Sequence, residues 1–179
     1  MSASAIRLSF LNELGNATTQ EIDKTMKFIQ VKTQDMSEII NDFMNFNKES
    51  NDEIFSLLDT IKSVNKIIDA QFMSKSIKLH IEVDPNIRVF HNKKFIEHSL
   101  LNILANAKDA FIEHPEIENK NIYIYAKKEN NIVSLFIQDN AGGISENIIG
   151  SIFNPYFTTK ENDKGTGIGL YMTKKMIGS

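Results

Sequence analysis

The stretch Gly165-Thr166-Gly167-Ile168-Gly169-Leu170, near the end of a chain of 179 residues, sets the first expectation for the fold. Glycines at alternate positions keep β-carbons away from the backbone. Successive N–H groups can then turn toward a phosphate where a predicted helix over 170–177 begins. The same kind of run also serves as an ordinary entry into a helix, so the upstream motifs must decide between the two uses.

A predicted helix over 93–112 contains the run Asn102-Ile103-Leu104-Ala105-Asn106-Ala107-Lys108-Asp109-Ala110. Asn102 and Asn106 are four residues apart and share one face, although asparagine is unfavourable inside a helix. Amide oxygens are hard, neutral ligands that suit a Mg²⁺ ion whose other ligands are water and nucleotide phosphates. The alternative is that these amides bond to neighbouring loops.

Two further runs favour a nucleotide site. DNAGGI at 139–144 places a carboxylate at the end of a predicted strand, ahead of a flexible turn. A buried carboxylate there would accept a hydrogen bond from the exocyclic amine of adenine and disfavour guanine, although an ordinary Asp-Asn turn is the alternative. IFNPYFTTK at 152–160 adds three aromatic residues, a proline and a lysine that can reach a phosphate. The polar residues 161–164 suit a lid over the nucleotide.

Composition excludes several classes of function. The net charge is −3 and no basic cluster stands out, so nucleic acid is not an expected partner. The chain has no cysteine, which excludes disulfides, thiolate catalysis and cysteine-bound zinc. No apolar run approaches the roughly 18 residues of a membrane span, and the N-terminus lacks the charged-then-apolar pattern of a signal peptide. We expect a cytoplasmic chain that reaches a membrane only through an upstream region.

Hydrophobic periodicity predicts an α+β chain with two domains. A heptad seam over 22–43 follows a shorter helical face over 6–14, so residues 1–49 are expected to form a helical hairpin. Two copies would pair into a four-helix bundle, the alternative being a hairpin packed on its own domain. Residues 50–179 alternate helices with strands, which predicts a mixed, mostly antiparallel sheet with helices on one face. The expected strands are 53–57, 77–83 with 88–91 as a short extension, 123–126 and 132–137; a helix over 58–73 precedes the one over 93–112.

The order and spacing of the four runs resemble the N, G1, F and G2 boxes of bacterial sensor histidine kinases, here at 102–110, 139–144, 153–160 and 165–170. The resemblance implies an ATP-binding α/β sandwich of the GHKL kind shared with gyrase, Hsp90 and mismatch-repair ATPases, with ATP and Mg²⁺ as cofactors. It also implies a homodimer formed through the hairpin, transfer of the γ-phosphoryl to a histidine, and a response regulator receiver domain as partner in a two-component system.

The resemblance assigns a role to each position that matches. It implies that Asn106 is the Mg²⁺ ligand with Asn102 beside it, and that Asp139 accepts from adenine. The related ATPases have a glutamate where Asn102 stands, and an amide is a poor base, so hydrolysis is disfavoured and Asn102 is the one candidate for a catalytic role. The residues expected to contact the nucleotide are Asn102, Asn106, Asp109, Asp139, Ala141, Gly143, Ile144, Phe157, Lys160, Gly165, Thr166, Gly167, Ile168, Gly169 and Leu170.

The sequence also departs from the family pattern. Residues 1–49 contain no histidine, so the phosphoacceptor is expected upstream of Met1 and this chain is not expected to phosphorylate itself. The last strands of the sheet are expected either to lie beyond Ser179 or to be replaced by a partner or a second copy that covers the open edge. Ala141 stands where the G1 box usually has glycine. One alternative is a nucleotide-binding interaction module that docks a response regulator or a partner kinase without catalysis. Another is a serine kinase of the anti-sigma type, which the predicted hairpin disfavours.

Overall fold

The computed structural model describes residues 25–26, 52–160 and 165–178. The chain divides into two units, residues 1–48 and 49–179. In the first unit the described residues are Thr25 and Met26, which are helical and exposed. The predicted helical hairpin over 1–49 and the predicted lid over 161–164 lie outside the described residues and stay predictions.

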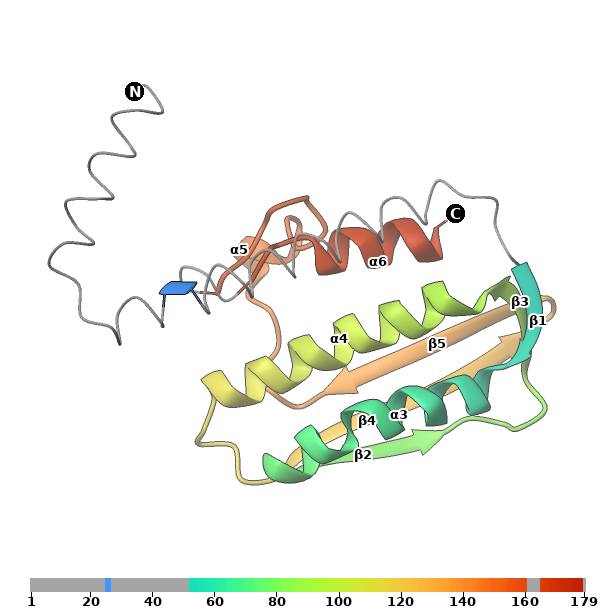
Figure 1. The fold of residues 1–179 in the computed structure, drawn as a ribbon, viewed down its shortest axis with the longest axis horizontal. Coiled ribbons are helices and arrows are strands. Elements are labelled where there is room, and N and C mark those ends of the chain that lie inside the picture. The colour runs from blue at the N-terminus through green and yellow to red at the C-terminus, as the bar shows by residue number, and fades with distance from the viewer. Residues whose placement is uncertain (1–24, 27–51, 161–164, 179) are drawn as a thin grey trace, which may run out of the picture. The chain divides into compact units, whose positions relative to one another are not determined.

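The described strands of the second unit form two sheets (Figure 1). β1 and β3 form an antiparallel ribbon in which Ile54 lies opposite Phe90. The larger sheet has the order β2-β4-β5; β2 runs parallel to β4, and β4 and β5 form an antiparallel hairpin. The elements are β1 (Asp52–Ser56), α3 (Leu57–Ser74), β2 (Ile77–Glu82), β3 (Arg88–Asn92), α4 (Lys93–Glu113), β4 (Lys120–Glu129), β5 (Ile132–Asp139), α5 (Glu146–Ile149) and α6 (Gly169–Ile177).

The prediction that residues 88–91 extend the strand over 77–83 is wrong. The chain turns at Asp84, whose side chain accepts from the Asn86 backbone N–H at 2.8 Å, and the Ile87 N–H bonds to the Asp84 carbonyl at 3.1 Å. The Ile87 carbonyl then accepts from the Leu57 N–H at 3.2 Å, which brings the chain beside β1. The predicted α+β class with a mixed sheet is confirmed.

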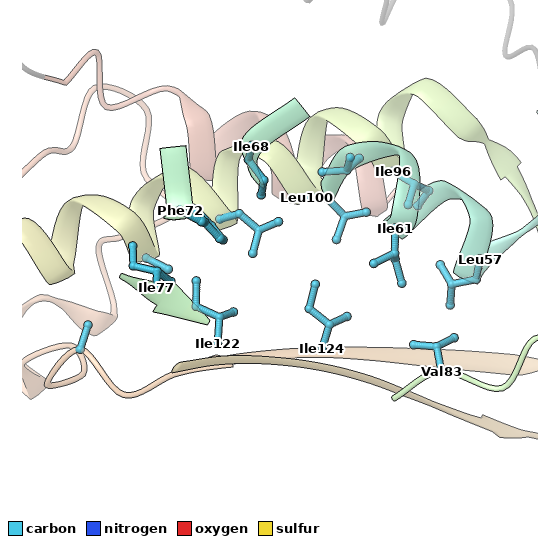
Figure 2. Packing of buried hydrophobic residues seen from close by; sticks show 14 of the residues in the cluster. Leu57, Ile61, Ile68, Phe72, Ile77, Val83, Ile96, Leu100, Ile122 and Ile124 are labelled. Carbon is cyan, nitrogen blue, oxygen red and sulfur yellow. The ribbon is translucent and has the colours of Figure 1, made fainter. Parts of the chain in front are cut away.

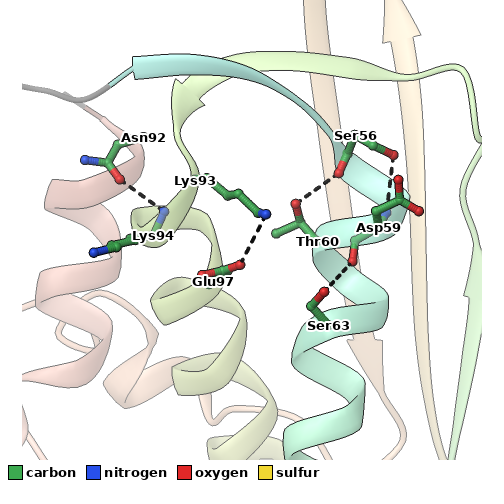
Figure 3. Close-up of polar contacts among 8 residues, drawn as sticks. All are labelled: Ser56, Asp59, Thr60, Ser63, Asn92, Lys93, Lys94 and Glu97. Atoms are coloured by element: carbon green, nitrogen blue, oxygen red, sulfur yellow. Dashed lines mark hydrogen bonds and ion pairs between the residues drawn. The ribbon is translucent and has the colours of Figure 1, made fainter.

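Polar side chains fix the points where α3 and α4 begin (Figure 3). The Ser56 hydroxyl accepts from the Asp59 backbone N–H at 3.3 Å, and the Asn92 carboxamide accepts from the Lys94 backbone N–H at 3.1 Å. Both are N-cap interactions, which satisfy donors that the first turn of a helix leaves unpaired. Because Ser56 ends β1 and Asn92 ends β3, each helix starts directly from a strand of the ribbon.

The core lies between α3 and α4 on one side and the larger sheet on the other (Figure 2). Each layer contributes aliphatic side chains that are at most 1% exposed; they are Ile61 and Val64 from α3, Leu100 and Leu104 from α4, and Ile122 and Ile124 from β4. Burying such a side chain stabilises the fold by about 1.5–3 kcal/mol. One face of α4 is therefore committed to the core, and its other faces are available for polar residues.

The last described helix, α6, lies alongside α4 and runs in the opposite direction (Figure 1). It buries Met172, Thr173 and Met176. This packing places the start of α6 beside the middle of α4. Within residues 25–26, 52–160 and 165–178, no helix combines the length and the apolar character that crossing a membrane requires.

Candidate nucleotide-binding site

The polar face of α4 carries Asn102, Asn106 and Asp109, which are all half-buried. Two of them meet the same lysine. The Lys160 ammonium donates to Asp109 Oδ2 at 2.6 Å and to Asn106 Oδ1 at 3.3 Å. The structure thus brings an amide oxygen and a carboxylate oxygen, from adjacent turns of one helix, onto one positive charge.

Lys160 reaches α4 because Gly165 leaves room for it. A β-carbon at Gly165 would lie 3.1 Å from Lys160 Cδ and 2.8 Å from Thr158 Oγ1, closer than such contacts normally are. The Thr158 hydroxyl also accepts from the Lys160 backbone N–H at 3.2 Å. The first glycine of the run at 165–170 therefore has a packing role in this structure, in addition to any contact with phosphate.

Asn102 joins α4 to the start of α6. Its amide donates a weak hydrogen bond to the Gly169 carbonyl at 3.5 Å, and a β-carbon at Gly169 would lie 3.4 Å from Asn102 Oδ1. The N-cap residue of α6, Ile168, provides no side-chain cap. The first N–H groups of this helix are thus available to an anion, and they lie beside the polar face of α4.

Gly167 occupies a position that only glycine tolerates. Its φ is +66°, and a β-carbon there would lie 2.4 Å from the Tyr156 carbonyl carbon and 2.7 Å from the Phe157 backbone N. Tyr156 itself has a φ of 65° and is exposed. The glycine run and the aromatic run are therefore held together by direct backbone contact.

The turn after β5 differs from the prediction in one respect. Asp139 is exposed, whereas a buried carboxylate was expected. Among the described residues, β5 stands at the edge of its sheet, and Asp139 is the last residue of that strand. Asp139 Oδ1 accepts from the Ala141 backbone N–H at 2.9 Å, and Gly142 and Gly143 follow with φ of 98° and 78°.

The glycine-to-alanine departure at Ala141 is accommodated by the core. Ala141 is 2% exposed and belongs to the hydrophobic cluster under the helices. Its methyl group is therefore used in packing, while the two glycines after it keep the left-handed backbone that the turn requires.

Sequence reasoning missed the residues that anchor this turn. The Asn140 side chain accepts from the Asn121 backbone N–H at 2.8 Å and donates to the Asn119 carbonyl at 2.7 Å. An asparagine directly after a strand is a signal for such a side-chain-to-backbone clamp. On the other side of the turn, the His114 ring lies 3.7 Å from where a β-carbon of Gly142 would stand.

His114 is itself held by Glu116, at 2.9 Å between Nδ1 and Oε1. The pKa of Glu116 is lowered by a backbone hydrogen bond and by the hydrogen bond with His114. Both groups are exposed. Their hydrogen bond therefore positions the imidazole beside the turn without contributing much to the stability of the fold.

The remaining predicted residues lie around these groups. Thr166 Oγ1 accepts from the Ile168 backbone N–H at 3.4 Å. Phe157, Ile168 and Leu170 are half-buried, and Ile144 is exposed. In the part of the chain that the structure describes, no group of three His, Cys, Asp or Glu side chains could hold a metal ion. A metal bound by Asn106 and Asp109 would therefore take its other ligands from water and phosphate, as Mg²⁺ does.

The domain combines a helix-covered sheet with a glycine run at the start of a helix and a carboxylate at the end of a strand. This combination defines the class of nucleotide-binding α/β sandwiches. Residues 91–178 match the family described as histidine kinase-, DNA gyrase B-, and HSP90-like ATPase. The matched domain belongs to this family, and the curated relatives of the chain include a two-component sensor and a sensor histidine kinase. The expected family and fold are confirmed.

Two curated relatives illustrate the match. The two-component sensor PprA of Pseudomonas aeruginosa is 37% identical over 84 residues, which is 46% of this chain and 9% of that protein. The tetrathionate sensor histidine kinase TtrS of Salmonella typhimurium is 33% identical over 102 residues, 57% of this chain and 16% of that protein. The chain thus aligns with less than a fifth of either relative's length.

Solved structures of histidine kinases share the fold. The catalytic domain of histidine kinase ThkA is 27% identical with a TM-score of 0.63, over 71% of this chain and 80% of that one. A crystal structure of ThkA in complex with the response regulator protein TrrA matches with a TM-score of 0.64 at 22% identity, over 86% of this chain and 46% of that one.

Proposed function

We propose that residues 50–179 form the ATP-binding catalytic domain of a sensor histidine kinase, which transfers the γ-phosphoryl of ATP to a histidine in two-component signalling. The observation that carries the proposal is the convergence of Asn106 Oδ1 and Asp109 Oδ2 on one cation. This cation site lies on the helix face that also contacts the start of α6 through Asn102. An oxygen ligand set beside open helix N–H groups suits a metal-bound polyphosphate.

In this proposal Asn106 is a Mg²⁺ ligand, with Asp109 as a second oxygen donor. Bound Mg²⁺ would neutralise charge on the phosphates. Lys160 and the start of α6 hold the phosphates themselves, and Asp139 accepts from the adenine amine. The other residues proposed to contact the nucleotide are Asn102, Ala141, Gly143, Ile144, Phe157, Gly165, Thr166, Gly167, Ile168, Gly169 and Leu170.

The chemistry favours transfer to a protein group over transfer to water. Asn102 stands where the family's ATPases have a glutamate, and its amide cannot take a proton from water. The phosphoryl acceptor is then a histidine nitrogen, which forms a bond to the γ-phosphorus while the bond to the β,γ-bridging oxygen breaks and ADP leaves. The domain positions the phosphates and stabilises their charge.

The proposed function as a histidine kinase domain also implies two partners. A homodimer would form through a helical hairpin in residues 1–49, and a response regulator receiver domain would take the phosphoryl group from the histidine. The ThkA structure with TrrA supports the second partner, since a protein of this fold binds a response regulator. A second candidate function, a nucleotide-binding module that docks such partners without catalysis, is favoured by the absence of histidine from residues 1–49.

Replacing Asn106 tests the metal assignment. We expect Asn106→Ala to weaken binding of Mg²⁺·ATP about 10- to 100-fold, the range seen when a metal site loses a supporting group, and to have little effect on ATP binding without Mg²⁺. Calorimetric titration of ATP with and without Mg²⁺ measures both. Asn131→Ala, in the exposed β4–β5 turn, is the matched control. Equal stimulation by Mg²⁺ in Asn106→Ala and Asn131→Ala would remove Asn106 from the site.

A further inference from the structure

The cluster of Lys160, Asn106 and Asp109 has a property that the proposed ATP site does not require. Its two acceptor oxygens are hard oxygen donors of the kind that Mg²⁺ selects, and they already bind the Lys160 ammonium at 3.3 and 2.6 Å. The side chains of Lys160 and Asp109 are 24% and 34% exposed, so the ion pair is partly shielded from water. The Lys160 ammonium therefore lies against the two oxygens, Asn106 Oδ1 and Asp109 Oδ2, that a metal cation would bind.

We propose that Lys160 is the resident cation of the nucleotide-free site and makes metal binding conditional on nucleotide. The inference rests on the proposed function. Two cations bind unfavourably to Asn106 and Asp109 at close range, because water screens their repulsion only in part where the cluster is partly shielded. Free Mg²⁺ must displace the ammonium from its two oxygens without offering it a new partner. Mg²⁺ that arrives with ATP brings phosphate oxygens, to which the displaced ammonium can move.

The residues around Lys160 leave space for its side chain to point toward Asn106 and Asp109. The aliphatic stem of Lys160 lies so close to Gly165 that a β-carbon on residue 165 would be 3.1 Å from Lys160 Cδ. The Thr158 hydroxyl accepts a hydrogen bond from the Lys160 backbone N–H at 3.2 Å. An ordinary surface ion pair between flexible side chains contributes little and requires no such space. The room left by Gly165 is independent support that the lysine is directed into the cluster.

Lys160→Met tests the inference, because it removes the charge and keeps an unbranched stem. In nucleotide-free protein, we expect Lys160→Met to bind Mn²⁺ at least about tenfold more tightly than the unmodified chain. The electron paramagnetic resonance signal of free Mn²⁺ measures this, and paramagnetic broadening of the amide signals of residues 106–109 locates the ion. ATP without metal should bind Lys160→Met more weakly, since a phosphate partner is lost. Lys160→Arg keeps the charge and should retain the low Mn²⁺ affinity.

Equal or weaker Mn²⁺ binding by Lys160→Met would overturn the inference. Adding Asn106→Ala to Lys160→Met should abolish the gain, and a gain that persists would place the ion elsewhere and also overturn it. Gly165→Ala is a second variant, expected to raise Mn²⁺ affinity because its methyl group displaces the lysine stem. The proposed function fails separately, if the unmodified chain binds no Mg²⁺·ATP. Binding that depends on Asn106, with no gain in Lys160→Met, overturns the resident-cation inference alone.

Discussion

Gly167→Ala is expected to weaken ATP binding strongly while the core between α3, α4 and the larger sheet stays folded. The added β-carbon would lie 2.4 Å from the Tyr156 carbonyl carbon and 2.7 Å from the Phe157 backbone N and O. All three are backbone atoms, which cannot turn aside as a side chain can. The φ of +66° adds a further cost of about 1–2 kcal/mol for alanine.

The loop must therefore rearrange, and the start of α6 moves with it. We expect ATP affinity to fall at least about 100-fold, equivalent to roughly 2.8 kcal/mol, in calorimetric titration. Gly150→Ala is the matched control, because Gly150 has an α-helical φ of −67° and a β-carbon there would meet nothing within 4 Å. Circular dichroism melting verifies that both variants fold. If Gly167→Ala bound ATP as Gly150→Ala does, the contact between the two runs would be irrelevant to the site.

Asp139→Asn is expected to weaken ATP binding about 10- to 100-fold, because a hydrogen bond to a charged group contributes roughly 1.5–3 kcal/mol. Asp139 Oδ1 is already engaged by the Ala141 N–H at 2.9 Å, which leaves the second oxygen to accept from the adenine amine. Asparagine can keep the first bond through its own oxygen. It then presents an N–H₂ donor where the adenine amine also donates.

The same change should raise the affinity for GTP relative to ATP, since the guanine carbonyl accepts from that donor. Competition between fluorescent ATP and unlabelled GTP measures the ratio. Asp84→Asn is a close control, because Asp84 makes the same kind of bond to the Asn86 backbone N–H in the turn between β2 and β3. Identical nucleotide preference in the two variants would mean that Asp139 serves only its own turn.

Local patterns in the sequence predicted the elements that hold the site. The apolar spacing over 93–112 gave α4 to within one residue, and alternation around Glu129 gave the β4–β5 hairpin. These patterns succeed because one face of each element is committed to the same core, which fixes which residues point inward. The stripe of Asn102, Asn106 and Asp109 follows directly from the helix.

The features that were missed depend on contacts between distant residues. Lys160 and Asp109 are 51 residues apart in the chain, so no local pattern indicates that they pair. The pairing of β3 with β1 follows from the turn at Asp84. It was missed because the sequence of a short strand carries little information about which strand lies beside it. The exposure of Asp139 depends on strand order, which places β5 at the edge of the sheet that the described residues form.

The central claim is that the α4 stripe, the turn after β5 and the glycine run form one nucleotide site. Amide chemical shifts measured during titration with Mg²⁺ and a non-hydrolysable ATP analogue test it most directly. The account predicts that residues 102–109, 139–144 and 165–172 shift together with a single dissociation constant, while the β1–β3 ribbon stays unchanged. Shifts confined to one of these segments, or separate saturation of each, would contradict it.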